Sequence, residues 1–367
     1  MSIYDELGVR RIINANATLT RLGGSIMPPE VLAAMQEAAD WFVDLDELHM
    51  RVGEKLAELT HNEAAYVATG AAAGIVLAVA ACAARGDRER MMRLPDTSGM
   101  KNEALVFKSH RNGYDHAIRN AGLKIVEIGD GTVCTPAELE AAINDRTAVL
   151  VWFQGAMTGR GDLPLAQVIE ICAIQGVPVI VDAAAQLPPL ENLWQFTQMG
   201  AACAIFSGGK DLRGPQSTGL VVGKKWLIEA MRPLGNPNQG LGRPMKVGKE
   251  EMVGLLAAVK RYMSLDHAAR RARDERIVAE WCRALNTRPG VCARRSFPNE
   301  AGQPLPRCEV ILDDTARLTR EALMAALMAG EPAISVAAAD ERGIFLNPMT
   351  LSDEEVGIVQ ARLLELL

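Results

Sequence analysis

Residues 201–225 read AACAIFSGGKDLRGPQSTGLVVGKK, and the organisation of the chain can be worked out from this stretch. Its apolar residues predict two buried strands, over 201–206 and 219–223, and the polar loop between them carries Lys210. The glycines before this lysine allow the backbone to approach a ligand closely. A desolvated lysine amine loses its proton more readily and can attack an aldehyde, so the loop suits a Schiff-base lysine. An ordinary lysine at a strand turn explains this segment equally well when it is taken alone.

The composition is typical of a two-domain α/β protein. A chain of 367 residues is longer than one compact core usually accommodates. Hydrophobic residues make up 49% of it and aromatic residues only 4%, which indicates alanine- and valine-rich packing. The formal net charge is −6, and the basic residues are spread along the chain, which argues against a nucleic-acid surface.

The cysteines and the N-terminal sequence indicate a cytoplasmic protein. The seven cysteines include no C-x-x-C pair and lie mostly in apolar runs, so we expect reduced core residues. The first residues, MSIYDELGVRR, contain no apolar segment of the kind that a secretory signal has. The longest apolar run, 71–84, is shorter than the roughly 20 residues that a membrane helix needs. We therefore expect no membrane partner.

The chain is predicted to have an N-terminal arm and two domains. Residues 1–27 contain NANATLT and RLGGS without a periodic apolar face, which indicates an irregular arm. A large domain over 28–248 begins with two helices, the second over about 44–60, because apolar residues recur there at three- and four-residue spacing. A helix predicted without interruption over about 249–285 opens a small α+β C-terminal domain, 249–367.

The motif ATGAAAG suggests a site for an anion. A short strand that ends at Ala68 is followed by the turn Thr69–Gly70 and by a helix predicted over 71–85. Amide groups at such a helix start, beside a hydroxyl group and a glycine, can bind an anion, and the small residues let a phosphate come close. An ordinary N-capped buried helix is the alternative interpretation.

Apolar strands and helices alternate through the middle of the chain. The predicted strands are 104–108, 124–128, 147–153 and 177–183. Because they are apolar throughout and separated by helices, they predict a mostly parallel sheet covered on both faces. Ligands of such sheets bind at the carboxyl ends of the strands. The polar residues expected at those ends are Thr69, His110, Gln154, Asp182 and Ser207.

Asp182 and Lys210 together match the needs of one cofactor. Asp182 closes the apolar strand VIVD, where an unpaired carboxylate would be costly. Lys210 follows 28 residues later, one helix and one strand on, so the two strand ends can be neighbours. Pyridoxal 5′-phosphate (PLP) requires a carboxylate for its ring nitrogen, a lysine for its aldehyde, donors for its phosphate and a flat side chain against its ring.

At these residues the chain resembles the fold type I PLP-dependent enzymes. The resemblance is carried by TGAAA at 69–73, His110, Asp182 with Ala184 and Gln186, and SGGK at 207–210. It is closer to the selenocysteine-synthase-like group, and it extends from about residue 4 to residue 251. The segments that are similar to that group are INANATLTRLGGSIMPPEV, FVDLDELHMRVGEKLAELT, ATGAAAGI, SGGKDLRGPQSTGLVVG and GRPMKVGKEEM.

The resemblance implies a large domain with a mostly parallel sheet, a smaller C-terminal α+β domain and PLP as cofactor. It implies that Lys210 forms the Schiff base with PLP and then acts as acid and base at the substrate Cα. Asp182 would pair with the protonated ring nitrogen. The amides of Gly70 and Ala71, together with the Ser207 hydroxyl, would bind the phosphate.

Two further residues have implied roles at the PLP ring. His110 would stack on the ring, and Gln186 is the weaker candidate for a contact to the ring oxygen. His110 could instead be a strand-end histidine, with Arg111 or Tyr114 nearer the ring. Related class V enzymes often carry Gln or His three residues after the aspartate, whereas this chain has Ala185.

The resemblance favours an ammonia-lyase or dehydratase that acts on a phosphorylated or acidic 2-amino-3-hydroxy acid, such as an amino sugar acid. The products would be a 2-keto-3-deoxy acid and ammonia. A racemase, aldolase or aminotransferase would use the same lysine and aspartate. Selenium transfer on seryl-tRNA is a further alternative, but the acidic pI of about 5.6 counts against a tRNA partner. A PLP-bound regulator is disfavoured because no helix-turn-helix segment precedes the PLP region.

Several arginines could bind the anionic end of the substrate, because a guanidinium holds a carboxylate or phosphate through two hydrogen bonds. The candidates are Arg21, Arg160, Arg213 and Arg342. Each of them could equally form a surface ion pair. We expect no metal site.

The arm and two glycine-containing loops predict a homo-oligomer. The arm has apolar residues without regular spacing, so it must bury them against a larger surface. Fold type I enzymes build their sites at subunit interfaces, and the loops GPQSTG at 214–219 and NPNQGLGR at 236–243 are the expected contributions from the neighbour. We therefore expect a homodimer or a larger even-numbered assembly.

Overall fold

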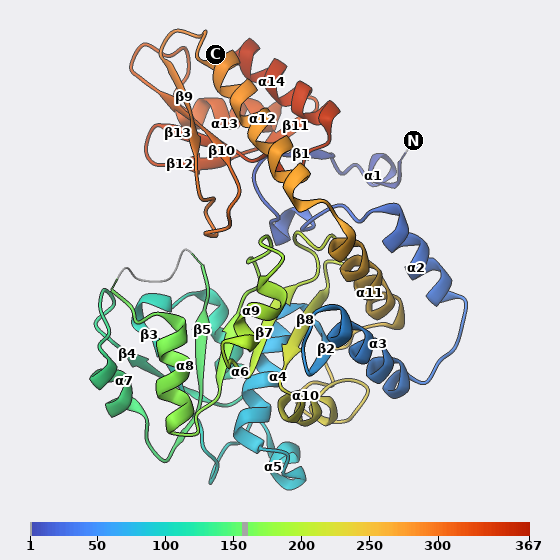
Figure 1. Cartoon of the computed structure of the whole chain (residues 1–367). Helices are drawn as coiled ribbons and strands as arrows, with labels where there is room; N and C mark the ends of the chain where they lie inside the picture. Colours follow the sequence, from blue (N-terminus) through green and yellow to red (C-terminus); the bar gives the residue numbers. More distant parts are fainter. Residues whose placement is uncertain (1, 156–160) are drawn as a thin grey trace. The chain divides into compact units, whose positions relative to one another are not determined.

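The computed structural model describes residues 2–155 and 161–367. The chain forms two compact units, which are both visible in Figure 1. The large unit is Met27–Leu265, and the small unit combines the described residues before Met27 with Asp266–Leu367. The large unit begins within one residue of the predicted boundary but ends at Leu265 instead of residue 248, and the N-terminal arm groups with the small unit. The packing of two elements explains both differences.

The first of these elements is α11 (Lys249–Ser264), which was predicted to open the C-terminal domain. It packs instead on α2 (Pro29–Ala39) and α3 (Leu45–Leu59) of the large unit. The second is β1 (Ile12–Asn14) in the N-terminal arm, which pairs in parallel with β11 (Ala333–Ser335). The arm therefore belongs to the small unit of its own chain.

The large unit is built on a seven-stranded sheet, as the apolar segments predicted. Six strands point the same way, and only β8 is antiparallel to its two neighbours. Across the sheet the order is β2 (Ala64–Thr69), β8 (Thr218–Gly223), β7 (Cys203–Ser207), β6 (Val179–Asp182), β5 (Thr147–Phe153), β3 (Glu103–Phe107) and β4 (Lys124–Ile128). The α/β architecture with a mostly parallel sheet is thereby confirmed.

Both faces of this sheet are covered, because side chains of a strand point alternately to either face. On β5, Val149 and Val151 belong to the apolar cluster that contains α4 (Gly70–Ala84). Leu150 and Trp152 belong to the cluster on the other face. Helix α4 is buried on nearly all sides, which explains why its sequence is apolar without a polar stripe.

Short helices follow the strands of the large unit. They are α5 (Arg88–Arg93), α6 (His116–Asn120), α7 (Pro136–Ala142), α8 (Leu165–Ile174), α9 (Asn192–Gln198) and α10 (Lys225–Met231), with 3-10 turns at η2 (Lys108–His110), η3 (Gly113–Asp115) and η4 (Arg232–Leu234). Helix α5 lies between α4 and β3. Asp87 caps it by accepting a hydrogen bond from the Arg90 amide at 3.1 Å.

The prediction of one uninterrupted helix over 249–285 was wrong. Helix α11 ends at Ser264, and a new helix, α12 (His267–Leu285), begins directly after Asp266. The Asp266 carboxylate accepts a hydrogen bond from the Ala269 amide at 2.8 Å. This N-cap stabilises a new helix start, and the apolar spacing on either side of it gave no sign of the break.

The small unit is an α+β structure. Its four-stranded antiparallel sheet has the order β12 (Ala337–Ala339), β13 (Gly343–Leu346), β10 (Arg307–Leu312) and β9 (Val291–Ser296). Its other elements are α1 (Ile3–Glu6), η1 (Thr20–Leu22), α12, α13 (Arg320–Ala329), η5 (Pro348–Thr350) and α14 (Asp353–Leu366). The core contains Trp281, Val310 and Leu363.

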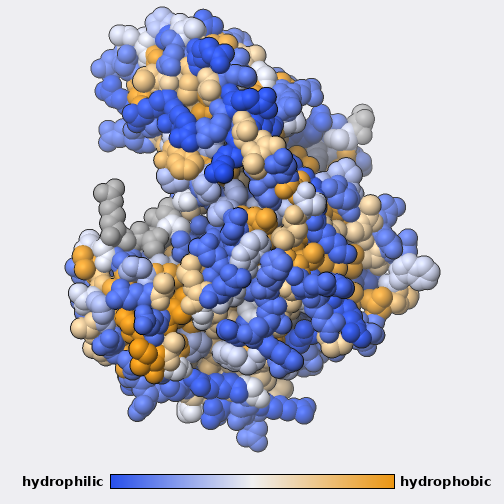
Figure 2. All heavy atoms as spheres, in the orientation of Figure 1, coloured by the Kyte–Doolittle hydropathy of each residue, from blue (hydrophilic) through white to orange (hydrophobic). Residues whose placement is uncertain are grey.

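The visible face of the molecule is mostly hydrophilic in the space-filling view (Figure 2). Apolar side chains are exposed at particular places, among them Ile174 at the end of α8 and Phe42 in the loop between α2 and α3. None of the helices in residues 2–155 and 161–367 has the length and apolar character that crossing a membrane requires.

Candidate functional site

The loop that carries Lys210 is tightly closed between β7 and β8. The Gly208 amide donates to the Thr218 carbonyl at 2.8 Å, and the Gly214 amide donates to the Gly208 carbonyl at 2.8 Å. A Cβ atom at Gly208 would lie 2.0 Å from the Thr218 hydroxyl oxygen, and one at Gly209 would lie 2.4 Å from a backbone atom. Glycine is therefore required at both positions, and Lys210 is held in a defined, half-buried place.

Asp182 is buried at the carboxyl end of β6, beside β7. Residue 182 pairs with Ile205, and the Ser207 amide donates to the Ala184 carbonyl at 3.3 Å, so the ends of these two strands stay together. Burial raises the pKa of the Asp182 carboxyl group, whereas the Ala184 amide at 3.0 Å and the positive charge of Lys210 lower it. The structure thus brings Lys210 and Asp182 into one electrostatic environment.

A small-residue cradle lies at the start of α4. Gly70 has a left-handed backbone with φ +70°, and α4 begins at this residue. The Thr69 hydroxyl does not cap the helix but donates to the Met245 carbonyl at 2.9 Å. A Cβ atom at Gly219 on β8 would lie 2.4 Å from the Gly70 carbonyl. The close approach of β8 to the start of α4 therefore requires glycine at position 219. A helix start without a side-chain cap leaves its first amides able to bind an anion.

Ser207 ends strand β7, which is separated in the sheet from β2 by β8 alone. It is the last residue of β7 and pairs with Gly219, whose backbone lies against Gly70. The neighbouring strand β2 ends at Thr69, which pairs with Thr218. The predicted phosphate donors therefore come from two strand ends, Gly70 and Ala71 after β2 and Ser207 at the end of β7, with the start of β8 between them.

His110 is fully buried just after β3. Its Nε2 atom lies 3.2 Å from Oδ2 of Asp162, and the Trp152 ring meets its ring edge-on at a centroid distance of 4.5 Å. Burial lowers the pKa of His110, and the Asp162 carboxylate opposes this shift. The Ser109 hydroxyl donates to the same Asp162 oxygen at 2.6 Å.

Asp162 is a residue that sequence reasoning missed. It follows β5 in a loop without apolar periodicity, and it reaches His110 only because β3 and β5 are neighbours in the sheet. The residues proposed as alternatives to His110 lie differently: Arg111 is paired with Asp115 at 2.6 Å and with Glu127, and Tyr114 is 61% exposed.

Gln186 is buried and bridges two strand ends. Its Nε2 atom donates to the backbone carbonyl of Gln154, just after β5, at 3.3 Å. The backbone carbonyl of Gln186 accepts a hydrogen bond from the Asn192 side chain at 2.6 Å. The Gln154 side chain in turn accepts a hydrogen bond from the Trp152 ring nitrogen at 2.7 Å. Gln186 therefore lies beside the end of β6, with its amide side chain directed to β5.

Three of the four candidate arginines lie in the described residues, one in the large unit and two in the small unit. Arg213 lies in the lysine loop, half-buried and in a left-handed conformation with φ 57°, where its amide donates to the Lys210 carbonyl at 2.9 Å. Arg21 and Arg342 belong to the small unit, where Arg21 is exposed and Arg342 pairs with Asp314 at 2.9 Å. Arg160 lies outside the described residues.

These groups fit PLP. A buried carboxylate, a lysine in its field and free helix amides behind a glycine cradle correspond to the ring nitrogen, the aldehyde and the phosphate of the cofactor. Within the described parts of the chain, no cluster of three or more His, Cys, Asp or Glu side chains could hold a metal ion.

Comparisons with known proteins agree with this assignment. The Aminotransferase class-V family matches residues 112–241. The chain is 35% identical over 373 residues to D-glucosaminate-6-phosphate ammonia lyase from Salmonella typhimurium, covering 100% of this chain and 98% of the relative. A solved structure of a D-glucosaminate-6-phosphate ammonia-lyase superposes with a TM-score of 0.87 at 33% identity and covers 100% of this chain and 98% of that one.

Two other relatives are named for different activities. The chain is 36% identical over 339 residues to a Streptomyces 5′-C-glycyluridine monooxygenase-decarboxylase, covering 90% of this chain and 83% of the relative. It is 27% identical over 395 residues to an L-seryl-tRNA(Sec) selenium transferase from Solidesulfovibrio magneticus, covering 95% of this chain and 80% of the relative. From the full-length similarity, the chain belongs to the selenocysteine-synthase-like group of fold type I PLP-dependent enzymes that contains D-glucosaminate-6-phosphate ammonia lyase, and it is an enzyme of the lyase type with PLP as its cofactor.

Proposed function

We propose that the protein is an ammonia-lyase for a phosphorylated 2-amino-3-hydroxy acid such as D-glucosaminate 6-phosphate. The substrate would lose its β-hydroxyl group as water, and hydrolysis of the resulting enamine would release ammonia and leave a 2-keto-3-deoxy acid. The similarity over the whole length to D-glucosaminate-6-phosphate ammonia lyase is the observation that carries this proposal. The position of Lys210 in the electrostatic field of Asp182 supports PLP chemistry, which a racemase, aldolase or aminotransferase would share.

Each residue of the site has a proposed task. When bound, PLP supplies an electron sink for the electrons left at the substrate Cα. Lys210 would hold the cofactor and move the proton at Cα, and Asp182 would keep the ring nitrogen protonated. The amides of Gly70 and Ala71 and the Ser207 hydroxyl would bind the cofactor phosphate.

The flat side chain against the PLP ring is proposed to be His110. Its contact with Asp162 at 3.2 Å fixes the ring plane, which a stacking residue requires. Tyr114 is the alternative, because it is the more exposed aromatic side chain in this segment. Gln186 would contact the ring oxygen after turning away from the Gln154 carbonyl.

Among the candidate arginines, we propose Arg213 as the one that binds the substrate anion. It shares the lysine loop with Lys210 and is half-buried, so its charge is less screened than that of a surface arginine. Replacement of an arginine that holds an anion by two hydrogen bonds removes a strong, directional contact.

We expect Arg213→Gln to raise KM for the phosphorylated substrate by about tenfold to hundredfold, the effect of losing hydrogen bonds to a charged group. The reaction rate at saturation should change less, because the proton-transferring lysine remains. Arg342→Gln is the matched control, since Arg342 forms an exposed ion pair in the small unit. Steady-state ammonia release measures both variants, and a KM that rises only in Arg342→Gln would contradict the assignment.

A substrate screen tests the proposed reaction. The holoenzyme is incubated with 2-amino-3-hydroxy acids with and without a phosphate group, and ammonia and keto acid are measured. Equal amounts of ammonia and keto acid from the phosphorylated amino sugar acid are the expected result. Amino acid racemisation, aldehyde formation or amino transfer without ammonia would instead identify a racemase, an aldolase or an aminotransferase.

The monooxygenase-decarboxylase relative gives a second candidate reaction, since its identity to this chain is as high as that of the ammonia lyase. An oxygen electrode and a carbon dioxide assay in the same screen separate the two. Oxygen uptake coupled to carbon dioxide release would favour oxidative decarboxylation. Ammonia release without oxygen uptake would favour the lyase. We propose no tRNA partner, because the chain carries a net charge of −6.

We further propose that the protein is a homodimer or a larger even-numbered homo-oligomer in the cytoplasm. Three apolar residues in the loop between α2 and α3, visible at the right of Figure 1, support the oligomer: Trp41 is 70%, Phe42 105% and Val43 48% exposed. Such a patch is typical of a protein interface. The free thiols of all seven cysteines support the cytoplasmic location.

The double substitution Trp41→Ser and Phe42→Ser is expected to weaken self-association on the order of 30-fold or more, as the loss of aromatic anchors does. PLP should be lost as the chains separate, if the neighbour completes the site. Sedimentation velocity over a dilution series measures the change. Ile174→Ser is the control, since Ile174 is 81% exposed on α8. Undiminished association of the double variant would show that this loop is not the interface.

A further inference from the structure

Two cysteine thiols meet inside the small unit. Cys282 lies on α12 and Cys308 on β10, and their Sγ atoms are 3.6 Å apart. Both residues belong to the same compact unit, in which α12 packs against β10. At this distance one thiol can donate a weak hydrogen bond to the other. A disulfide bond would require the two sulfur atoms to approach by about 1.5 Å.

The two cysteines differ in their access to solvent. Cys308 is fully buried in the core of the small unit, whereas Cys282 is partly exposed at the edge of this core. A small oxidant in solution can therefore reach Cys282. Cys308 is shielded from such an oxidant, but its sulfur atom lies in contact with that of Cys282.

The contact between the two thiols favours the thiolate of Cys282. The hydrogen bond from Cys308 lowers the pKa of Cys282, and burial opposes this shift. The same hydrogen bond, together with burial, raises the pKa of Cys308. Because the thiolate is the form that attacks a disulfide, Cys282 is suited to the first attack, and Cys308 keeps its proton until a second step.

The other cysteine of the small unit, Cys292, does not share this environment. It pairs on β10 with Ile311, whereas Cys308 pairs with Arg295. Side chains alternate between the two faces of a strand, so residues 308 and 311 point to opposite faces of the sheet. Cys292 is therefore exposed on the face away from Cys308.

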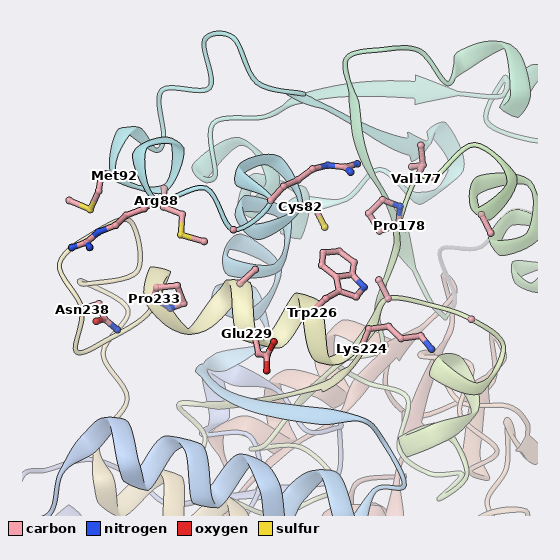
Figure 3. Close-up of a pocket in the computed structure, with 18 of the residues that line it drawn as sticks. Cys82, Arg88, Met92, Val177, Pro178, Lys224, Trp226, Glu229, Pro233 and Asn238 are labelled. Atoms are coloured by element: carbon pink, nitrogen blue, oxygen red, sulfur yellow. The ribbon is translucent and has the colours of Figure 1, made fainter.

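A thiol of the large unit shows a different limit on reactivity. Cys82 lines the same pocket as Trp226 (Figure 3), but it is only 1% exposed. Burial raises the pKa of Cys82 to about 12, so hardly any thiolate is present near neutral pH. Cys282 differs from it by combining partial exposure with a hydrogen-bonding thiol.

We propose that Cys282 and Cys308 form a redox-active pair, which small disulfides convert reversibly into a disulfide bond between α12 and β10. In the first step the Cys282 thiolate attacks one sulfur of the small disulfide, so that a mixed disulfide forms on Cys282 and one small thiolate leaves. In the second step Cys308 attacks the Cys282 sulfur and releases the other small thiolate. Each released thiolate takes up the proton that the attacking cysteine has lost. Two protein thiols are thereby oxidised, and one small disulfide is reduced to two thiols.

The bond would close a loop over residues 282–308, which contains β9. Transient disulfides of this kind act as redox-responsive elements in cytoplasmic proteins. The pair lies in the small unit, and its oxidation does not depend on the reaction proposed above.

Incubation of the holoenzyme with bis(2-hydroxyethyl) disulfide tests the proposal, because this reagent carries no amine that could react with PLP. Free thiols are alkylated at successive times, and the peptides are mapped by mass spectrometry. We expect the Cys282 and Cys308 thiols to be lost together, with a mass decrease of about 2 Da, and dithiothreitol to restore both. Cys82 should react at least about tenfold more slowly.

Single variants separate the two steps. In Cys308→Ser the reaction should stop at a mixed disulfide on Cys282, and in Cys282→Ser the Cys308 thiol should stay reduced. Cys292→Ser is the matched control and should form the disulfide at the wild-type rate. A lasting mixed disulfide on Cys282 of the wild type, an unreactive Cys282, or a disulfide that includes Cys292 would overturn the proposal. Circular dichroism and the PLP absorption of each variant verify its fold, and Cys308→Ala replaces Cys308→Ser if the serine variant does not fold.

Discussion

Lys210→Ala is expected to abolish turnover and to remove the yellow colour of the bound cofactor. The loop between β7 and β8 holds this lysine in the electrostatic field of Asp182. A methyl group can neither hold PLP covalently nor move a proton at Cα. The loss of general acid and base catalysis alone costs roughly 10²- to 10⁴-fold in rate. Absorption spectra and ammonia release measure the two effects separately.

The control for this variant is Lys124→Ala, which changes an exposed lysine on β4 and should keep both colour and activity. Borohydride reduction of the wild-type protein, followed by peptide mapping, provides a second readout that needs no substrate. The label should be found on Lys210. A label on another lysine, or a coloured Lys210→Ala protein that the reduction still fixes, would refute the assignment.

The sequence was sufficient to predict the sheet and the proximity of Asp182 to Lys210, because both depend on the order of strands and helices along the chain. Apolar runs set β5, β6 and β7, and one helix between two parallel strands brings their carboxyl ends together. Asp182 and Lys210 follow directly from that rule. The glycines around the lysine gave a further signal, which the close contacts of Gly208 and Gly209 explain.

Features that depend on contacts between distant segments could not be predicted in this way. Asp162 meets His110 only through the pairing of β3 with β5. The separation of α11 from α12 depends on the N-cap at Asp266, and the spacing of apolar residues along the sequence continues across this cap.

Asp182→Asn is expected to keep PLP bound and yet to lose activity on the order of 10²- to 10³-fold, as the loss of a preorganised electrostatic contact does. The phosphate cradle at Gly70 and the covalent attachment at Lys210 would remain. An amide cannot stabilise the protonated ring nitrogen, so the electron sink is weakened. Near-normal turnover with bound PLP would assign Asp182 a structural role instead.

The same substitution should change how the stability of the PLP-free protein depends on pH. Burial raises the folded-state pKa of Asp182 above its ordinary value of 3.8, so the folded protein binds this proton more tightly than the unfolded chain does. Stability of the wild-type apoprotein is therefore lost as pH rises from about 3.8 through the raised pKa, where a buried carboxylate must ionise. The amide that Asp182→Asn introduces cannot ionise, so the Tm of the variant apoprotein relative to wild type should increase over this window and then level off.

Glu127→Gln, at an exposed carboxylate of β4, serves as the control. Thermal melts of the apoproteins at a series of pH values from about pH 4 upward measure the difference. PLP should reduce it by pairing the wild-type carboxylate with its ring nitrogen. A Tm difference that falls with rising pH would contradict the raised pKa and with it the reason for placing a cationic ring beside Asp182.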